Sequence, residues 1–174
     1  MNILKRLFIF QNERFPLKIL VFTTGATVLA SAVVSTSKPT YYSIAFAFIT
    51  TLFFLFHIRV IDEDRDFKTD ENLHPHRPVQ RGIITIKELF IIDLIGLLIC
   101  ATISLLAGVP AVVITAAILI FTFLAWKDFY SNEFFKNRPI VYHLANSPQI
   151  ILIQWNIYAI YTKSLHINWP MVLL

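Results

Sequence analysis

Residues 41–58 read YYSIAFAFITTLFFLFHI, and the acidic stretch DEDRDFKTD follows at residues 62–70. The first run is apolar and close to the roughly 20 residues that a helix needs to cross the hydrocarbon core of a bilayer. The second places five carboxylates at the end of that span, in a chain of which only 15% of the residues are charged. Because clustered like charges need compensation, the acidic stretch is the first candidate for a functional site.

The composition predicts an α-helical membrane protein. Of the 174 residues, 56% are hydrophobic, and the mean hydropathy is +0.65. A soluble domain carries about 25% charged residues, well above the fraction found here. The 16 Phe against only 4 Gly favour helices in lipid over the alternating strands of a β-barrel. We therefore expect an all-α membrane protein, a bundle of several transmembrane helices.

Five apolar runs have lengths that approximate a span, at residues 19–34, 41–58, 83–107, 110–126 and 141–161. Residues 1–18 are expected to form an amphipathic helix at the membrane interface, with Leu4 and Phe8 toward lipid and Lys5 and Arg6 toward head groups. Residues 169–174 are typical of the first turn of a sixth helix, with an interfacial tail as the alternative. The prediction is a single membrane domain over residues 1–174, continuing in a longer protein.

The basic residues are distributed asymmetrically between the two sides of the predicted bundle. Thirteen of the 15 Lys and Arg lie before the first run, around the acidic stretch, or between the fourth and fifth runs, and only Lys38 and Lys163 lie on the other side. The positive-inside rule then predicts a cytoplasmic N-terminus and acidic stretch, in the inner membrane of the cell. The net charge of +4 follows from this asymmetry, so the expected partner is the lipid bilayer and not nucleic acid. Nothing in the sequence sets an oligomeric state.

The spacing of the acidic residues favours binding of a cation. Asp62, Asp66 and Asp70 are four residues apart, so a continuing helix places them on one face, with Glu63 on the neighbouring stripe. Carboxylates at a membrane face can hold Mg²⁺ against a diphosphate, because Mg²⁺ binds through a few carboxylates together with substrate phosphates. Arg77 can meet further phosphate oxygens. The alternative is a solvated loop whose carboxylates pair with neighbours such as Arg65 or Lys68.

The order Asp62-Glu63-x-x-Asp66-x-x-x-Asp70, followed by Arg77-Pro78-x-x-x-Gly82, resembles the first aspartate-rich motif of the UbiA superfamily of intramembrane prenyltransferases. The family pattern is N-D-x-x-D-x-x-x-D and then R-P-[LIV]-x-x-G, in the cytoplasmic loop after the second transmembrane helix. The resemblance implies a catalytic, Mg²⁺-binding group of side chains, formed by Asp62 in place of the Asn, Glu63 in place of the first Asp, Asp66 and Asp70. It also implies that Arg77 binds diphosphate.

Two further sets of polar residues are candidates for the same site. Family members carry a tyrosine and basic residues between the fourth and fifth helices, so the resemblance implies diphosphate binding by Tyr130, Lys136 and Arg138, with membrane anchoring as the alternative. Inside the predicted spans, Asp93, His143 and Asn146 are expected to face the bundle interior. They would line a cavity there or form hydrogen bonds between helices.

The activity that the resemblance implies is transfer of a polyprenyl group from its diphosphate to an aromatic or other lipophilic acceptor, with Mg²⁺-assisted loss of pyrophosphate. The chain corresponds to the first five of the family's roughly nine transmembrane helices, and it has no second aspartate-rich motif, because no Asp follows Asp128. We therefore expect half of a diphosphate site, active as part of a longer chain. The alternative is a noncatalytic membrane protein whose acidic cytoplasmic loop binds a cation or a partner protein.

Overall fold

The computed structural model describes residues 1–135 and 138–166, and every regular element in those ranges is helical. This confirms the all-α expectation. The helices are α1 (Ile3–Glu13), α2 (Leu17–Val34), α3 (Tyr41–Arg65), α4 (Phe67–Leu73), α5 (Ile86–Ala107), α6 (Val109–Trp126), the 3-10 turn η1 (Asp128–Tyr130), α7 (Asn132–Phe135), α8 (Pro139–Asn146) and α9 (Pro148–Thr162).

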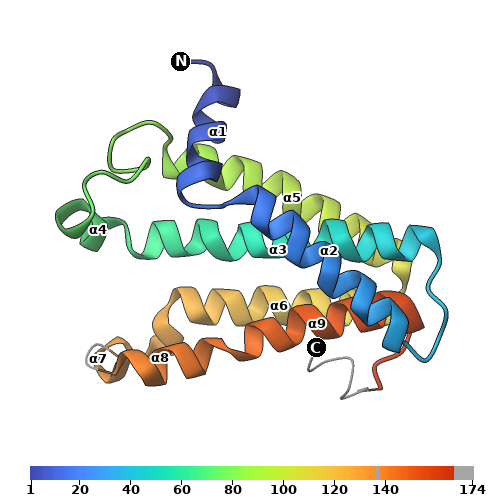
Figure 1. The fold of residues 1–174 in the computed structure, drawn as a ribbon. Coiled ribbons are helices and arrows are strands. Elements are labelled where there is room, and N and C mark those ends of the chain that lie inside the picture. The colour runs from blue at the N-terminus through green and yellow to red at the C-terminus, as the bar shows by residue number, and fades with distance from the viewer. Residues whose placement is uncertain (136–137, 167–174) are drawn as a thin grey trace.

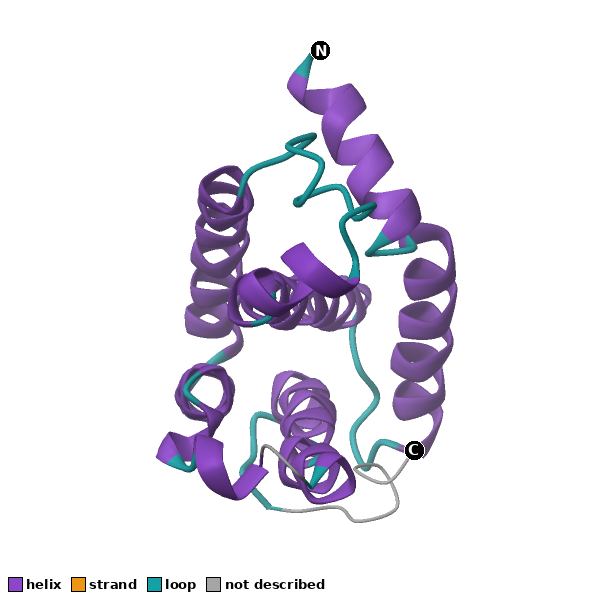
Figure 2. Cartoon of the chain, turned by 90° about the vertical axis from the view of Figure 1, so that its left-hand side faces the viewer, coloured by secondary structure: helices purple, strands orange, loops and turns teal. Residues whose placement is uncertain are grey.

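The long helices form two layers. Figure 1 shows α3 and α5 running side by side, with α6 and α9 side by side beneath them and α2 crossing α3. Figure 2 shows the bundle from the end at which α4 and α8 lie, with α3 near the centre of the view. Helix α3 contacts α2, α5, α6 and α9, so it is the centre of the bundle. The stretch that the sequence singled out therefore begins on a helix that packs against four others.

Hydrogen bonds between helices stabilise the bundle at positions where no water competes for the polar groups. Ser104 on α5 and Thr115 on α6 lie 2.7 Å apart through their hydroxyl oxygens, and the Asn156 amide of α9 donates to the Thr115 hydroxyl at 3.1 Å. Gln149, at the start of α9, donates to the Thr122 hydroxyl at 2.6 Å. These polar side chains connect α5, α6 and α9. From the sequence, hydrogen bonds between helices could be expected only in general, without knowing which side chains would form them.

Close contact between α3 and α5 depends on a glycine. A Cβ atom at Gly96 of α5 would lie 2.4 Å from Cδ1 of Phe53 on α3, which is far inside van der Waals contact. The ring of Phe53 therefore occupies the space that any larger residue would need. This contact sets how near the two central helices approach each other.

Within residues 1–135 and 138–166, four helices are long and apolar enough to cross a membrane: α2, α3, α5 and α6. The protein is accordingly an integral membrane protein by the length and composition of its helices. The predicted fifth span, residues 141–161, was wrong as a single element, because the chain is divided there into α8 and α9. Pro148 explains the division, since its nitrogen cannot donate a helical hydrogen bond and its ring crowds the preceding turn. The expected sixth helix at residues 169–174 lies outside the described residues.

The N-terminal segment also differs from the expectation of one interfacial helix over residues 1–18. Helix α1 ends at Glu13, and a turn through Pro16 leads into α2. Leu4 and Phe8 are exposed as expected, but Phe10 and Phe15 are buried against Val60, Val79, Ile84 and Leu89. Helix α1 is thus packed on the end of the bundle where the acidic stretch lies.

Candidate functional site

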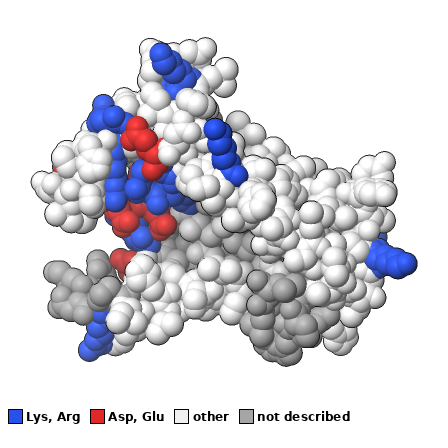
Figure 3. All heavy atoms as spheres, in the orientation of Figure 1, with Lys and Arg blue, Asp and Glu red and all other residues white. Residues whose placement is uncertain are grey.

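The charged side chains gather at one end of the bundle, where α3 meets α4 and α1 (Figure 3). Helix α3 runs without interruption to Arg65, so Asp62, Glu63 and Asp64 belong to its last turn and not to a loop. The backbone bends at Asp66, and α4 then begins at Phe67. The charged residues are therefore held on regular backbone, which gives their side chains defined directions.

The expected helical relation between the three aspartates is present in the backbone. The amide of Asp66 donates to the carbonyl of Asp62 at 3.0 Å, and the amide of Asp70 donates to the carbonyl of Asp66 at 2.8 Å. Each aspartate thus follows the previous one by one helical turn across the bend. The side chains, however, enter two separate groups of ion pairs.

The first ionic group consists of Asp62, Asp66, Arg65 and Tyr142. Nη2 of Arg65 lies 2.9 Å from a carboxylate oxygen of Asp62, and its Nε lies 3.0 Å from a carboxylate oxygen of Asp66. Nη1 of the same arginine donates to the hydroxyl of Tyr142 on α8. The Asp62 and Asp66 side chains are 33% and 46% exposed, so both remain accessible to a ligand at the end of the bundle.

The second ionic group is buried and contains Glu63 and Asp70. Nε of Arg14 donates to Oε1 of Glu63 at 2.6 Å, and Arg59 donates to the same oxygen. Oε2 of Glu63 is enclosed without a hydrogen-bond partner among the described residues. Asp70 is also buried, and Arg77 donates to its carboxylate. These two carboxylates therefore connect α3 and α4 to neighbouring segments and are shielded from the surface.

Helix α1 and the residue that caps its end, Arg14, contribute three of the ion pairs at this end, which the sequence did not predict. Besides Arg14, which pairs with Glu63, Arg6 pairs with Glu88 at the start of α5. Glu13 accepts from Arg81 at 2.7 Å in the connection between α4 and α5. The charged residues among the apolar ones of residues 1–18 were the available signal for these ion pairs. Their partners could not be identified, because they are distant in sequence.

The connection from α4 to α5 holds the residues that resemble the R-P-x-x-x-G segment. Arg77 forms the pair with Asp70 described above, and it does not face open solvent as a free phosphate ligand would. Gly82 has a φ of +69°, the left-handed conformation that glycine adopts without strain, and the chain reverses there. Helix α5 begins at Ile86, three residues later than the predicted start at 83, and Thr85 and Glu88 form a capping box at its N-terminus.

The two described members of the second predicted set of diphosphate ligands, Tyr130 and Arg138, form no ion pair or hydrogen bond with the acidic stretch in the ranges that the structure describes. Tyr130 is 72% exposed, and the Arg138 guanidinium lies 4.3 Å from the ring centroid of Phe134 without an ion pair in the described part of the chain. Lys136 lies outside the described residues. Tyr142 is the side chain from this region that reaches the acidic stretch. No role was predicted for Tyr142 from the sequence.

The predicted cavity residues have different environments. His143 is exposed on α8, so it does not face the bundle interior. Asn146 is half-buried, and its amide donates to the carbonyl of Tyr142 in its own helix at 2.9 Å. Asp93 is buried as expected. Its carboxylate oxygen Oδ2 lies 2.8 Å from Nδ1 of His57, a residue of α3 that sequence reasoning did not place in the site. An ionisable residue inside a predicted span was the signal that could have identified His57.

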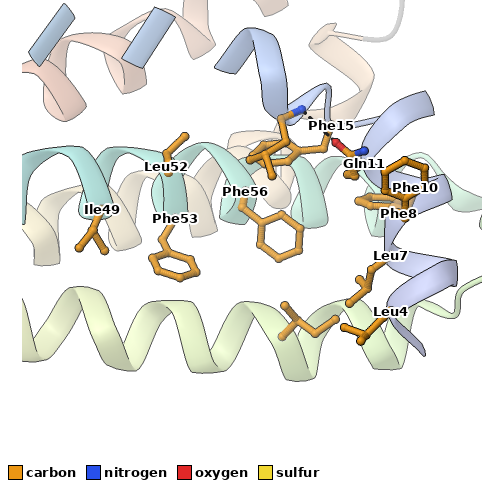
Figure 4. Close-up of a pocket in the computed structure, with 12 residues that line it drawn as sticks. Leu4, Leu7, Phe8, Phe10, Gln11, Phe15, Ile49, Leu52, Phe53 and Phe56 are labelled. Atoms are coloured by element: carbon orange, nitrogen blue, oxygen red, sulfur yellow. Dashed lines mark hydrogen bonds between the residues drawn. The ribbon is translucent and has the colours of Figure 1, made fainter. Parts of the chain in front are cut away.

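A cavity of about 920 Å³ lies at the charged end itself, with Asp64, Arg65 and Lys68 in its lining, and two further cavities lie beside that end. One, of about 450 Å³, lies between α1 and α3, and its lining contains no titratable side chain (Figure 4). The other, of about 490 Å³, lies between α3, α5 and α6 and is lined by His57 and Asp93 among apolar and aromatic residues. Trp126 separates this second cavity from the acidic stretch, since its indole nitrogen donates to Asp64 at 3.0 Å.

The described residues contain no group of three or more His, Cys, Asp and Glu side chains placed to hold a metal ion. Comparisons with protein-family models, with curated proteins and with solved structures find no match for this chain. The chemistry of the charged end is therefore inferred from its own side chains.

Proposed function

We propose that the charged end of the bundle binds the diphosphate group of a prenyl diphosphate together with Mg²⁺, as part of a membrane prenyltransferase. The observation that carries this proposal is the backbone relation of Asp62, Asp66 and Asp70, which follow one another by single helical turns at the end of the central helix. Asp62 and Asp66 are the accessible pair, and Arg65 lies between them. The cytoplasmic orientation predicted by the basic residues belongs to the same proposal.

The carboxylates are compatible with Mg²⁺ as one part of its coordination shell. Mg²⁺ is usually bound by one or two protein carboxylates together with substrate phosphates and water, so a complete cage of protein ligands is not required. In this proposal, Asp62 and Asp66 hold the ion, and Arg65 moves from the carboxylates to the phosphate oxygens. Bound Mg²⁺ would stabilise the negative charge that develops on the departing diphosphate.

The ion pairs describe a resting state in this scheme. An arginine that bridges two carboxylates neutralises their repulsion when no cation is present. A diphosphate offers a guanidinium more acceptor oxygens than a carboxylate does. Asp70 and Glu63 would act as positioning residues, because Arg77 and Arg14 hold them in the buried group.

Binding of farnesyl diphosphate to the full chain in nanodiscs, measured with and without Mg²⁺, tests the proposal. Asp66→Asn should weaken Mg²⁺-dependent binding about tenfold or more, because it removes an anionic ligand. Glu71→Gln is the matched control. Glu71 is an exposed acid of α4, the helix that Asp66 caps, and it does not belong to the series of aspartates spaced by four residues. Binding that is independent of Mg²⁺, or equal in the two variants, contradicts the proposal. Release of pyrophosphate in the presence of a phenolic acceptor would then show whether the bound substrate reacts.

A noncatalytic role for the acidic stretch is the second candidate, and one observation favours it. Asp62, Glu63, Asp66 and Asp70 each already pair with an arginine, as expected of a charged scaffold that holds helix ends together. In that case Asp66→Asn would alter the stability of the protein in detergent, and farnesyl diphosphate would not bind at all.

A further inference from the structure

We propose that the cavity between α3, α5 and α6 is a binding site, separate from the acidic stretch, for an apolar molecule that carries a hydroxyl group. The hydroxyl would hydrogen-bond to the His57–Asp93 pair, and the apolar part would fill the rest of the cavity. The site is open to molecules dissolved in the membrane, and it does not depend on the proposed prenyl transfer.

The His57–Asp93 pair is the polar element of the cavity. His57 is 8% exposed and Asp93 is 4% exposed, and their side chains meet at 2.8 Å between α3 and α5. Ionisable groups at this depth are costly in a membrane protein and commonly mark a ligand or proton pathway. The hydrogen bond to Asp93 fixes the orientation of the imidazole ring, as carboxylate partners do for functional histidines.

The ring nitrogen Nε2 of His57 is available for a ligand. It makes no hydrogen bond within the described residues, and it is not among the fully enclosed polar atoms. A neutral imidazole that donates from Nδ1 to Asp93 presents Nε2 as an acceptor, whereas a protonated ring presents it as a donor. A hydroxyl group can both donate and accept, so it satisfies Nε2 in either state.

The rest of the lining selects an uncharged, apolar molecule. Apart from His57 and Asp93, the wall consists of aliphatic and aromatic side chains: Ile61, Leu94, Leu97 and Leu119, and Phe90, Phe123 and Trp126. The volume of about 490 Å³ lies within the range of small-molecule sites. When the imidazole is neutral, Asp93 is the charged side chain in this lining, and it would repel a carboxylate or phosphate.

The cavity is reached from the outer surface of the bundle. Leu94 on α5 is 58% exposed and Phe123 on α6 is 47% exposed, so the rim lies where these two helices face lipid. Trp126 is held by Asp64 at the opposite, charged end. A ligand would therefore arrive sideways from the bilayer and not through the diphosphate site.

Saturable binding of 4-butylphenol and of butylbenzene to the full chain in nanodiscs, corrected with empty discs and measured without Mg²⁺ or prenyl diphosphate, tests this proposal. The phenol should bind about tenfold more tightly than butylbenzene, a difference of about 1.4 kcal/mol. A site built around a hydrogen bond discriminates strongly against an analogue that lacks the hydroxyl. Equal binding of the two probes, or no saturable binding of either, overturns the proposal.

Paired variants show whether the His57–Asp93 pair is responsible. H57L/D93L removes both partners, which a folded protein tolerates better than one unpaired buried charge, and the preference for the phenol should fall to about onefold. S104A/T115V removes another buried polar pair, between α5 and α6 outside this cavity, and should leave the preference unchanged. A preserved preference in H57L/D93L contradicts the assignment.

A second variant keeps the proposal testable if H57L/D93L does not fold. Leu119→Trp fills the cavity from α6 and leaves the polar pair in place, so it should abolish saturable binding of both probes. The cavity between α1 and α3 provides an internal comparison, because its lining contains the amide of Gln11 but no ionisable side chain. Binding that survives Leu119→Trp would place the probe elsewhere and contradict the site.

Discussion

Glu63 shows how the environment of one side chain can differ from the role that its spacing suggests. The resemblance implied a metal ligand at this position, beside Asp62 and Asp66. In the structure its side chain is completely buried, and Arg14 and Arg59 donate to one of its oxygens. The three charges form a connection between α1 and the end of α3. Glu63 is therefore expected to matter first for stability.

Replacement of Glu63 tests that role. Glu63→Gln leaves two arginines without their shared anion, so we expect the protein to lose about 2 kcal/mol of stability. The measurement is an unfolding titration with SDS in mixed micelles. Glu13→Gln is the control, because the Glu13–Arg81 pair is 40% exposed on each side and solvent screens it. Equal midpoints for the two variants would mean that the buried group contributes no more than the exposed one.

At the scale of helices, the contact between α3 and α5 is the interface most sensitive to side-chain size. Phe53 lies in the space above Gly96, so the two helices approach as closely as a glycine permits. The same two helices carry His57 and Asp93, and their spacing therefore also sets the distance within that pair. Packing and the proposed hydroxyl site are coupled through this interface.

Gly96→Ala should destabilise the protein by about 1–3 kcal/mol, the usual cost of forcing an extra methyl group into a well-packed contact. Gly25→Ala is the matched control on α2, since its Cβ would lie 3.8 Å from Phe48, an ordinary contact. Thermal unfolding in detergent compares the two variants. The double variant G96A/F53L should recover part of the loss, and a stable Gly96→Ala protein would show that α5 can move away from α3 without cost.

At the scale of the whole molecule, the charges are divided between the two ends of the bundle. The ion pairs of α1, α3, α4 and α5 lie together at one end, and Lys38 lies in the connection between α2 and α3 at the other (Figures 1 and 3). From the distribution of Lys and Arg, the positive-inside rule predicts that the end with the acidic stretch is the cytoplasmic one, and this orientation stays a prediction.

Accessibility of single cysteines tests the orientation. In a Cys100→Ala background, Lys38→Cys should react in intact cells with a maleimide that cannot cross the membrane, whereas Lys68→Cys should react only after the cells are opened. Both lysines are exposed on the protein, so the difference reports the side of the membrane and not burial. Labelling of Lys68→Cys in intact cells would reverse the orientation.

Much of the architecture could be read from local properties of the chain. Hydropathy and run length identified the four long helices, because a membrane span needs only enough consecutive apolar residues to cross the bilayer. The four-residue spacing of Asp62, Asp66 and Asp70 was also sufficient, since helical backbone continues through Asp66. Pro148 itself indicated that the fifth run could be divided there. The run was nevertheless predicted as one span, because its overall hydropathy is that of a membrane helix.

The partners of the charged residues depended on the packing of helices that are distant in sequence. Arg14 reaches Glu63 only because α1 folds back on the bundle. Tyr142 reaches Arg65 only because α8 lies beside the end of α3. His57 and Asp93 meet for the same reason, across the interface that Gly96 permits. Composition and periodicity are local properties of the chain, and a membrane helix depends on such local properties. They therefore determine the membrane class of the protein and the positions of its helices. Which carboxylate is buried, which is accessible and which faces a cavity follows from how those helices contact one another.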